Sequence, residues 1–271
     1  MKKLLKLVLL IGAIYIFLYV NNHWIVTTEL TYESEKVPAS FDGYRITQIT
    51  DLHDAQFGEG QEKLIKKVRA TNPDVIFITG DVVDSRRYDL ERSMQAVRQL
   101  VDIADVYYVL GNHEVALNKM TEIYDVMTEA GVRVLANDAV NFERDGEQLA
   151  IVGIEDPLMG KSVPDMLDTA LEDVHADTFT LLLSHRPEQF KSYVAQEMDI
   201  VFTGHAHGGQ VRLPFIGGLA APTQGMFPKY TAGVFEENET YMVISRGLGN
   251  SIFPYRIFNL PEIIVLELQA K

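Results

Sequence analysis

The chain has 271 residues with 24 basic and 38 acidic side chains, a formal net charge of −14, and no cysteine. This length, with 47% hydrophobic residues, suits one large α/β domain or two small ones and excludes a disordered chain. The lack of cysteine excludes disulfides, thiolate metal sites and a cysteine nucleophile, so any metal must have nitrogen and oxygen ligands.

The charge is distributed unevenly along the chain. Residues 1–24 contain Lys2, Lys3 and Lys6 and no acidic residue, so residues 25–271 hold 21 basic and 38 acidic side chains, a net −17. A domain this acidic repels a phosphate backbone. We therefore expect no nucleic-acid partner.

The N-terminal segment is a candidate membrane helix. Residues 7–20 form an uncharged apolar run between Lys6 and Trp24. The run also suits a cleaved signal peptide, but no small-x-small cleavage motif follows it. If Lys6 snorkels, the run lengthens to about 17 residues, the lower limit for crossing a bilayer. We favour an uncleaved, single-pass signal-anchor with Trp24 at the far interface over a signal peptide or a buried soluble helix.

The positive-inside rule orients this helix. All three lysines precede it, which predicts a cytoplasmic N-terminus and an extracytoplasmic domain at the cell membrane. We divide the chain into a cytoplasmic tip with the transmembrane signal-anchor (1–24), a linker or edge strand (25–43) and one domain (44–271).

Beyond residue 43, short apolar runs typical of buried strands alternate with amphipathic runs typical of helices. We expect strands at residues 46–49, 75–79, 106–110, 149–154, 179–183, 200–202, 241–245 and 263–268. We expect helices at residues 64–70, 90–103 and 120–130. Strands that are apolar on both faces need helices on both sides, so we predict a layered α/β sandwich.

Many of these strands end in side chains that can bind metals. Of the six histidines beyond the membrane segment, five follow predicted strands: His53, His113, His185, His205 and His207. One such histidine alone is more often a turn cap or a hydrogen-bonded core residue than a ligand. The carboxyl ends of strands in an α/β sheet meet at one edge, however, so the whole set gathers where ligands bind.

The same strand ends supply oxygen donors. Asp51 and His53 are two residues apart, a spacing that lets both grip one cation in extended geometry. Asp81 follows Gly80 and has two oxygens with which to bridge two cations, and Asn112 offers an amide oxygen. With the imidazoles, these groups suffice for two metal ions that keep positions open for water and substrate.

Five ordered motifs resemble the calcineurin-like metallophosphoesterase family: Asp51-x-His53, Gly80-Asp81-x-x-Asp84, Gly111-Asn112-His113-Glu114, His185 and Gly204-His205-x-His207. Residues 245–249 and 254–256 resemble its membrane-attached bacterial branch. The resemblance implies a four-layer αββα sandwich. It assigns one metal ion to Asp51, His53, Asp81 and His207, and the other to Asp81, Asn112, His185 and His205.

The expected chemistry is hydrolysis of a phosphate ester by metal-activated water, with no protein nucleophile. The two divalent ions can be Mn, Fe, Zn or Ni, because all four bind mixed nitrogen and oxygen ligands. His113 is the candidate proton donor to the leaving oxygen, and the family pattern points to Asp84 as its orienting partner. Asp84 can instead cap the turn after Asp81, and we interpret Glu114 as a helix N-terminal acid instead of a catalyst.

Some residues depart from the pattern or stay ambiguous. The protein serine/threonine phosphatases have Asp-Arg-Gly where this chain has Asp84-Ser85-Arg86. This difference argues against a phosphoprotein substrate. Asp54 is a supporting partner of the site or, as we favour, a solvated loop residue. Arg186 and Arg246 are candidate substrate-binding residues for phosphate, with surface ion pairs as the alternative.

The apolar residues 213–235 form either a ledge for a lipid tail or the membrane interface, or part of the ordinary core. We expect a membrane-anchored phosphoesterase acting on a phosphodiester, pyrophosphate or phosphomonoester, with a lipid-linked or cell-envelope substrate preferred. The alternative is a catalytically inactive, metal-stabilised envelope binding protein, whose ligand set would normally be broken. The oligomeric state is not predicted.

Overall fold

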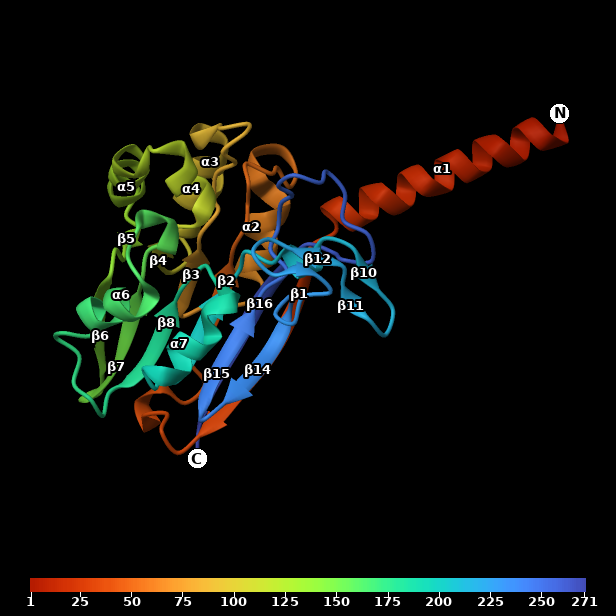
Figure 1. Ribbon diagram of the computed structural model, residues 1–271. Coiled ribbons are helices and arrows are strands. Elements are labelled where there is room, and N and C mark those ends of the chain that lie inside the picture. Colours follow the sequence, from red (N-terminus) through yellow and green to blue (C-terminus); the bar gives the residue numbers. More distant parts are fainter.

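Two six-stranded β-sheets stack face to face in the computed structural model, which describes residues 1–271, and helices cover their outer faces (Figure 1). The predicted four-layer αββα sandwich is confirmed. The first sheet has the order β1-β16-β2-β3-β4-β5, and the second has the order β14-β15-β9-β8-β7-β6.

The strands of the first sheet are β1 (Val26–Ser34), β16 (Glu262–Ala270), β2 (Arg45–Ile49), β3 (Val75–Thr79), β4 (Asp105–Val109) and β5 (Arg133–Val134). Strands β2 to β5 are parallel, and β16 runs antiparallel to β2. Strand β1 pairs with β16 in parallel as an edge strand. The sequence between the apolar N-terminal helix and the domain is therefore part of the sheet.

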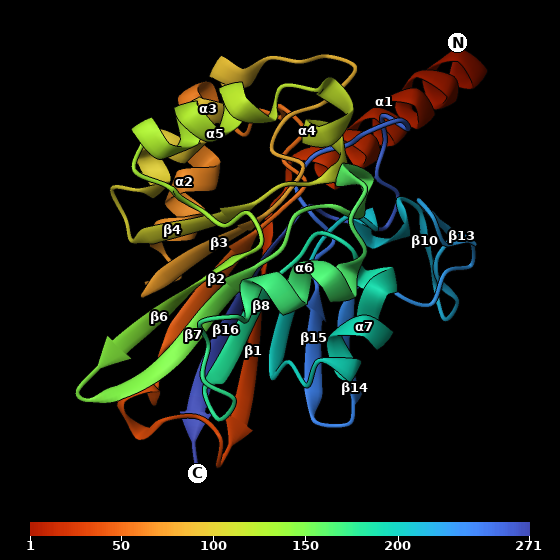
Figure 2. The same ribbon diagram turned by 60° about the vertical axis from the view of Figure 1, so that its left-hand side comes forward.

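The strands of the second sheet are β14 (Gly233–Glu237), β15 (Thr240–Ile244), β9 (Ile200–Thr203), β8 (Phe179–Leu183), β7 (Glu147–Gly153) and β6 (Asp138–Arg144). The four inner strands are parallel, and antiparallel hairpins add β6 and β14 at the edges. Figure 2 shows this sheet with helices α6 (Val163–Ala170) and α7 (Phe190–Ala195) over it.

Alternation along the strands builds the layers. In β3, Phe77 points between the sheets, where its ring centroid lies 5.1 Å from that of Phe202 in β9. Its neighbours Ile76 and Ile78 belong to the cluster on the outer face, under α2 (Glu62–Arg69), α3 (Leu90–Leu100) and α5 (Met120–Glu129). Inner strands such as β3 thus contribute to two apolar layers, which explains the continuous apolar runs in the sequence.

Eight strands and two helices lie within two residues of their predicted limits. Helix α3 ends three residues early, because the amide of Ile103 donates to the carbonyl of Leu100 in a tighter turn. The six-residue helices α4 (Asn112–Leu117) and α7 were missed, as were α6, the short β5 and the polar edge strands β6 and β14. Short elements and half-exposed edge strands leave little periodic signal.

Helix α1 (Lys2–His23) projects away from the domain (Figure 1). It is long and apolar enough to cross a membrane, and Asn21 is its only buried residue. The buried soluble helix considered in the sequence analysis is therefore excluded. Two small antiparallel pairs follow β9 along the chain: β10 (Arg212–Leu213) with β11 (Gly217–Gly218), and β12 (Ala220–Ala221) with β13 (Gly225–Met226).

Candidate metal centre

The ligand-type side chains lie together at the carboxyl ends of strands from both sheets. They follow β2, β3 and β4 in the first sheet and β8 and β9 in the second: Asp51, His53, Asp81, Asn112, His185, His205 and His207. The facing sheets thus contribute to one site from opposite sides.

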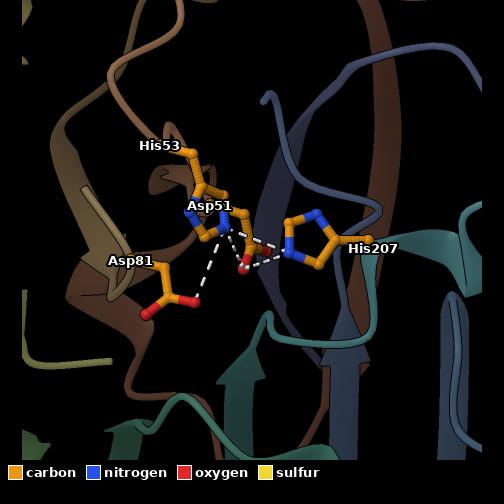
Figure 3. A group of neighbouring side chains, drawn as sticks. All are labelled: Asp51, His53, Asp81 and His207. Atoms are coloured by element: carbon orange, nitrogen blue, oxygen red, sulfur yellow. Dashed lines mark hydrogen bonds and ion pairs between the residues drawn. The ribbon is translucent and has the colours of Figure 1, made fainter. Parts of the chain in front are cut away.

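Four of these side chains converge (Figure 3): Asp51, His53, Asp81 and His207. The Nε2 atoms of His53 and His207 lie 3.1 Å apart. His207 Nε2 is 3.5 Å from Asp51 Oδ1, and His53 Nε2 is 3.6 Å from Asp81 Oδ2. His53 Nε2 is 4.0 Å from Asp51 Oδ1, and all four ligand atoms lie within 4.8 Å of one another. Ligand atoms about 2.0–2.2 Å from one metal ion are roughly 3–4.4 Å apart, so this group could hold a single cation.

A second group adjoins the first through Asp81. His185 Nε2 lies 3.2 Å from Asp81 Oδ2, 3.2 Å from Asn112 Oδ1 and 3.2 Å from His205 Nδ1. Asp81 Oδ2 therefore faces both groups, while Oδ1 accepts a hydrogen bond from the His113 amide at 2.8 Å. This differs from the expectation that each carboxylate oxygen faces its own cation.

The electrostatics of the two groups favour bound cations. Burial raises the pKa of Asp51 to about 7 and lowers that of His53 to about 3. Burial also lowers the pKa values of His205 and His207, so these imidazoles stay neutral with lone pairs available. A divalent cation would stabilise the ionised form of the buried Asp51 carboxyl group and bind the lone pairs of the neutral imidazoles. These nitrogen and oxygen donors are ones that divalent transition metals accept.

His185 is charged while no cation is bound. Burial lowers its pKa, but the Asp81 carboxylate raises it more, to about 10. The same ion pair holds the pKa of Asp81 well below its usual value, although burial acts in the opposite direction. A metal ligand must be a neutral imidazole, so metal binding competes with this proton.

The backbone at the site is held in an unusual conformation. Five of the candidate ligands have left-handed φ angles between 47° and 65°: Asp51, His53, Asp81, His205 and His207. This conformation is uncommon for residues other than glycine and persists only where the surroundings impose it. Gly111 is part of these surroundings. It leaves room for the Asp81 carboxylate, which a Cβ at position 111 would overlap.

Glu114 holds the two turns of the first sheet together. It is fully buried; its Oε2 accepts from the amides of Asp81 at 3.0 Å and Gly111 at 2.9 Å, and its Oε1 accepts from Val82 at 2.6 Å. Burial, and then the charge of Asp81, raise its pKa to about 8. It is thus a helix N-terminal acid that also ties the turn after β3, which carries the candidate ligand Asp81. This second role was not predicted, although the capping-box spacing to Gly111 is visible in the sequence.

His113 lies at the edge of the site. Its Nδ1 accepts from the Ser85 amide at 3.0 Å, and its Nε2 is 3.1 Å from Ser251 Oγ. The predicted partner, Asp84, has its Oδ1 3.9 Å from Nδ1. Asp84 instead accepts from the Arg86 amide at 2.8 Å and pairs with Arg87 at 2.6 Å. From the sequence, Ser85 is only a departure from the protein phosphatase pattern, and Ser251 is not singled out at all; neither is predicted to contact His113.

The favoured interpretation of Asp54 as a solvated loop residue is wrong. Asp54 is buried; its Oδ2 accepts from the Asp84 amide at 2.9 Å and its Oδ1 from Ser93 Oγ at 2.8 Å. The local sequence around Asp54 does not indicate its burial, because its hydrogen-bond donors, Asp84 and Ser93, lie 30 and 39 positions later in the chain. Asp54 anchors the loop that follows Asp81.

The two candidate substrate-binding arginines are already paired. Arg186 is buried, bonds both oxygens of Asp156 at 2.5 and 2.9 Å, and has Nη1 2.8 Å from His205 Nε2. A surface ion pair is therefore excluded for it. Arg246 donates to Glu262 at 2.7 Å with its side chain 20% exposed. Asp156 follows β7 as the ligands follow their strands, so the strand-end pattern could have indicated it.

The profile of the family described as calcineurin-like phosphoesterase matches residues 44–209. The uncharacterized metallophosphoesterase YkuE of Bacillus subtilis is 30% identical over 93% of this chain and 88% of its own. Phosphodiesterase YaeI of Escherichia coli is 28% identical over 83% of this chain and 82% of its own.

A protein of Danio rerio named transmembrane protein with metallophosphoesterase domain is 27% identical over 87% of this chain and 55% of its own. Among solved structures, a 5'-nucleotidase precursor from Thermus thermophilus superposes with a TM-score of 0.53 at 15% identity. That match covers 76% of this chain and 49% of the nucleotidase, and it shows a common fold.

Replacing Glu114→Gln should destabilise the site. The amide NH2 would face two backbone N–H groups that now share one carboxylate oxygen, and unsatisfied buried groups of this kind cost about 1–3 kcal/mol each. Urea unfolding of the metal-free protein should show this loss. Glu129→Gln, at an exposed end of α5, is the matched control, and equal stability of the two variants would contradict the role of Glu114.

The metal-free protein should lose stability as the pH rises from about 6.5 to about 10. The pKa of His185 is raised on folding, so its ion pair with Asp81 stabilises fully below the unfolded value of 6.5 and disappears as pH passes the folded value of about 10. In the presence of chelator, the unfolding temperature should fall less steeply with rising pH in His185→Gln than in the wild type. The exposed His175→Gln is the control, and parallel pH profiles for all three proteins would contradict the assignment.

Proposed function

The chain belongs to the calcineurin-like phosphoesterase family and is a phosphoester hydrolase, and we propose that it works as a membrane-anchored enzyme with two divalent metal ions. The observation that carries this proposal is the shared position of Asp81 Oδ2, 3.6 Å from His53 Nε2 and 3.2 Å from His185 Nε2. One carboxylate oxygen thus faces two groups of nitrogen and oxygen donors.

The two proposed metal positions use the donor groups described above. Asp51, His53, Asp81 and His207 would hold one ion, and Asp81, Asn112, His185 and His205 the other. Bound divalent ions supply Lewis acidity, which neutralises phosphate charge and lowers the pKa of water. The donors suit Mn, Fe, Zn or Ni.

Backbone hydrogen bonds orient two of the candidate ligands, Asp51 and His185. Asp51 accepts the His205 amide at 3.1 and 3.2 Å, which ties the end of β2 to the end of β9. His185 Nδ1 contacts the Thr79 carbonyl at 2.8 Å, which directs Nε2 toward Asp81. The ends of both sheets are thereby held in one arrangement before substrate arrives.

We propose His113 as the proton donor to the leaving oxygen. The Ser85 amide can only donate, so His113 Nδ1 is an acceptor in this arrangement and the neutral ring carries its proton on Nε2. To give a proton to the leaving oxygen the ring must first be protonated on both nitrogens, and Ser85 Oγ, 3.1 Å from Nδ1, can then accept from Nδ1–H. Asp84 acts as a positioning residue, because its bond to the Arg86 amide shapes the turn that presents the Ser85 amide.

The substrate we propose is a phosphodiester, pyrophosphate or phosphomonoester, with a lipid or envelope phosphodiester preferred. Helix α1 would restrict the enzyme to the membrane, and the relative YaeI is named a phosphodiesterase. Of the two arginines, Arg246 is the more exposed candidate for phosphate contact, whereas Arg186 positions His205. The proposed topology is a cytoplasmic N-terminus with an extracytoplasmic domain after residues 1–24 and 25–43.

The 271-residue chain in detergent should hydrolyse bis-p-nitrophenyl phosphate, p-nitrophenyl phosphate or both when manganese is added, and should lose this activity on chelation. Asp81→Ala should abolish it, since Asp81 faces both donor groups. Asp125→Ala, an exposed acid on α5, is the matched control. Retained hydrolysis in Asp81→Ala, or none in the wild type with any divalent metal, would contradict the proposal.

His113→Ala should lower turnover by roughly 10²–10⁴ and leave the bound metal unchanged, because general acid catalysis supplies a factor of that size. Metal content by elemental analysis and turnover should be measured on the same preparation. His175→Ala, on an exposed loop, is the control. Loss of metal in His113→Ala would instead make His113 a ligand.

A further inference from the structure

Large apolar side chains are exposed in two loops. Beyond Trp24, ten large hydrophobic side chains are exposed, and eight of them lie in residues 213–228 and 247–260. We name these segments the 213–228 loop and the 247–260 loop. Their exposed side chains are Phe215, Ile216, Met226 and Phe227 in the first, and Ile252, Phe253, Tyr255 and Phe258 in the second. The alternative of core packing for the 213–228 loop is therefore wrong for its largest side chains.

Neither loop exposes a charge. The 213–228 loop contains no charged residue, and the single charge of the 247–260 loop, Arg256, is fully buried and donates to the Gly249 carbonyl. Arg212 and Lys229 flank the first loop, whereas Arg246, before the second, is paired with Glu262 just beyond that loop. In a domain with a net charge of −17, an uncharged apolar surface with a basic border suits a membrane surface.

The 247–260 loop is attached to α1. Asn22 Oδ1 accepts from Asn250 Nδ2 at 2.7 Å and from the Arg256 amide at 3.1 Å. Asn21 Oδ1 accepts from the Asn259 amide at 3.3 Å. These contacts hold the loop against the end of the helix. Figures 1 and 2 both show the loop, coloured blue, beside the base of α1.

Contact with α1 places the loop at membrane depth. The ring of Phe258 lies 5.1 Å from that of Phe17, which is inside the apolar run of α1. Phe17 precedes His23 by six residues, about 9 Å along a helix. If α1 crosses a bilayer, Phe258 must therefore lie below the surface from which the helix emerges.

The two loops form one surface. Gln210 Nε2 donates to Asn250 Oδ1 at 3.0 Å and to the Tyr255 carbonyl at 2.9 Å. The Arg212 amide donates to the Ile257 carbonyl at 3.0 Å. The residues that lead directly into the 213–228 loop are thus bonded to the 247–260 loop, which brings the two loops next to each other.

The same surface borders the metal centre. Ser251 Oγ is 3.1 Å from His113 Nε2, and Asn259 Nδ2 donates to the His207 carbonyl at 2.7 Å. A cavity of about 210 Å³ lined by His53 lies next to one of about 560 Å³ lined by α1. They share four lining residues, Ala55, Gln56, Asn250 and Pro254.

We propose that the two loops and the C-terminal end of α1 form a membrane-docking surface, which seats the domain on the bilayer that holds α1. The metal centre then opens at the lipid–water interface, within reach of a phosphoester on a lipid headgroup. The proposal rests on the proposed anchoring and activity. Continuity with α1 at the depth of Phe17 favours the bilayer over a second copy of the chain or a soluble partner.

The natural absence of cysteine allows a direct test on the full chain. Single cysteines at Phe215, Phe227 or Phe253 would carry a nitroxide label, with the protein in vesicles of phosphatidylethanolamine and phosphatidylglycerol. Gln148, exposed at the start of β7 and so at the sheet edge opposite the site, is the control position. Collisions with oxygen, which partitions into lipid, and with aqueous chromium oxalate report the surroundings of each label.

We expect the three loop labels to collide several-fold less with chromium oxalate than the control label, and more with oxygen. Labels as accessible to chromium oxalate as the control would overturn the proposal. The measurement should be repeated in nanodiscs that hold one protein each. If the loop labels then lose their protection from chromium oxalate, a second copy of the chain and not the bilayer covers the surface, and the proposal is overturned. Lipid-buried labels on a chain with no metal-dependent hydrolysis of bis-p-nitrophenyl phosphate would support docking and contradict the proposed function.

Discussion

The position of the Asp81 carboxylate is the constraint on which the rest of the site depends. One of its oxygens is tied to the His113 amide, and the other faces donors from both sheets. Burying so many polar groups is unfavourable unless each is paired or bound to a cation. The surrounding structure supplies that pairing through Glu114, through the absence of a side chain at Gly111, and through left-handed backbone at five candidate ligands.

The pattern of strands ending in polar residues predicted which side chains meet, because parallel strands deliver their carboxyl ends to one edge. It could not predict how they are held. Asp54 and Glu114 act mainly through backbone amides of turns that are distant in the sequence. Only the bond from the Gly111 amide to Glu114 has a sequence signature, the capping-box spacing. Likewise, the contacts of His113 with Ser85 and Ser251 depend on turn geometry and on a loop 138 residues away.

The apolar N-terminal helix and the candidate metal centre are physically connected in this fold. The 247–260 loop bonds to Asn22 at the end of α1, reaches His113 through Ser251, and bonds to the His207 carbonyl through Asn259. In the sequence, the N-terminal helix and the ligand motifs are separate features, because more than 200 residues separate Asn22 from Asn250. Their proximity follows from β1, which returns the chain from the helix to pair with β16 beside β2.

The measurement that tests the central claim most directly is the number of divalent ions bound per chain, determined by elemental analysis after equilibration and removal of free metal. We predict two ions in the wild type, one in His207→Ala and one in His185→Ala, because each change removes a donor from one group alone. Asp81→Ala should retain neither ion. A single ion in the wild type, or two ions retained in Asp81→Ala, would contradict the shared carboxylate on which this account rests.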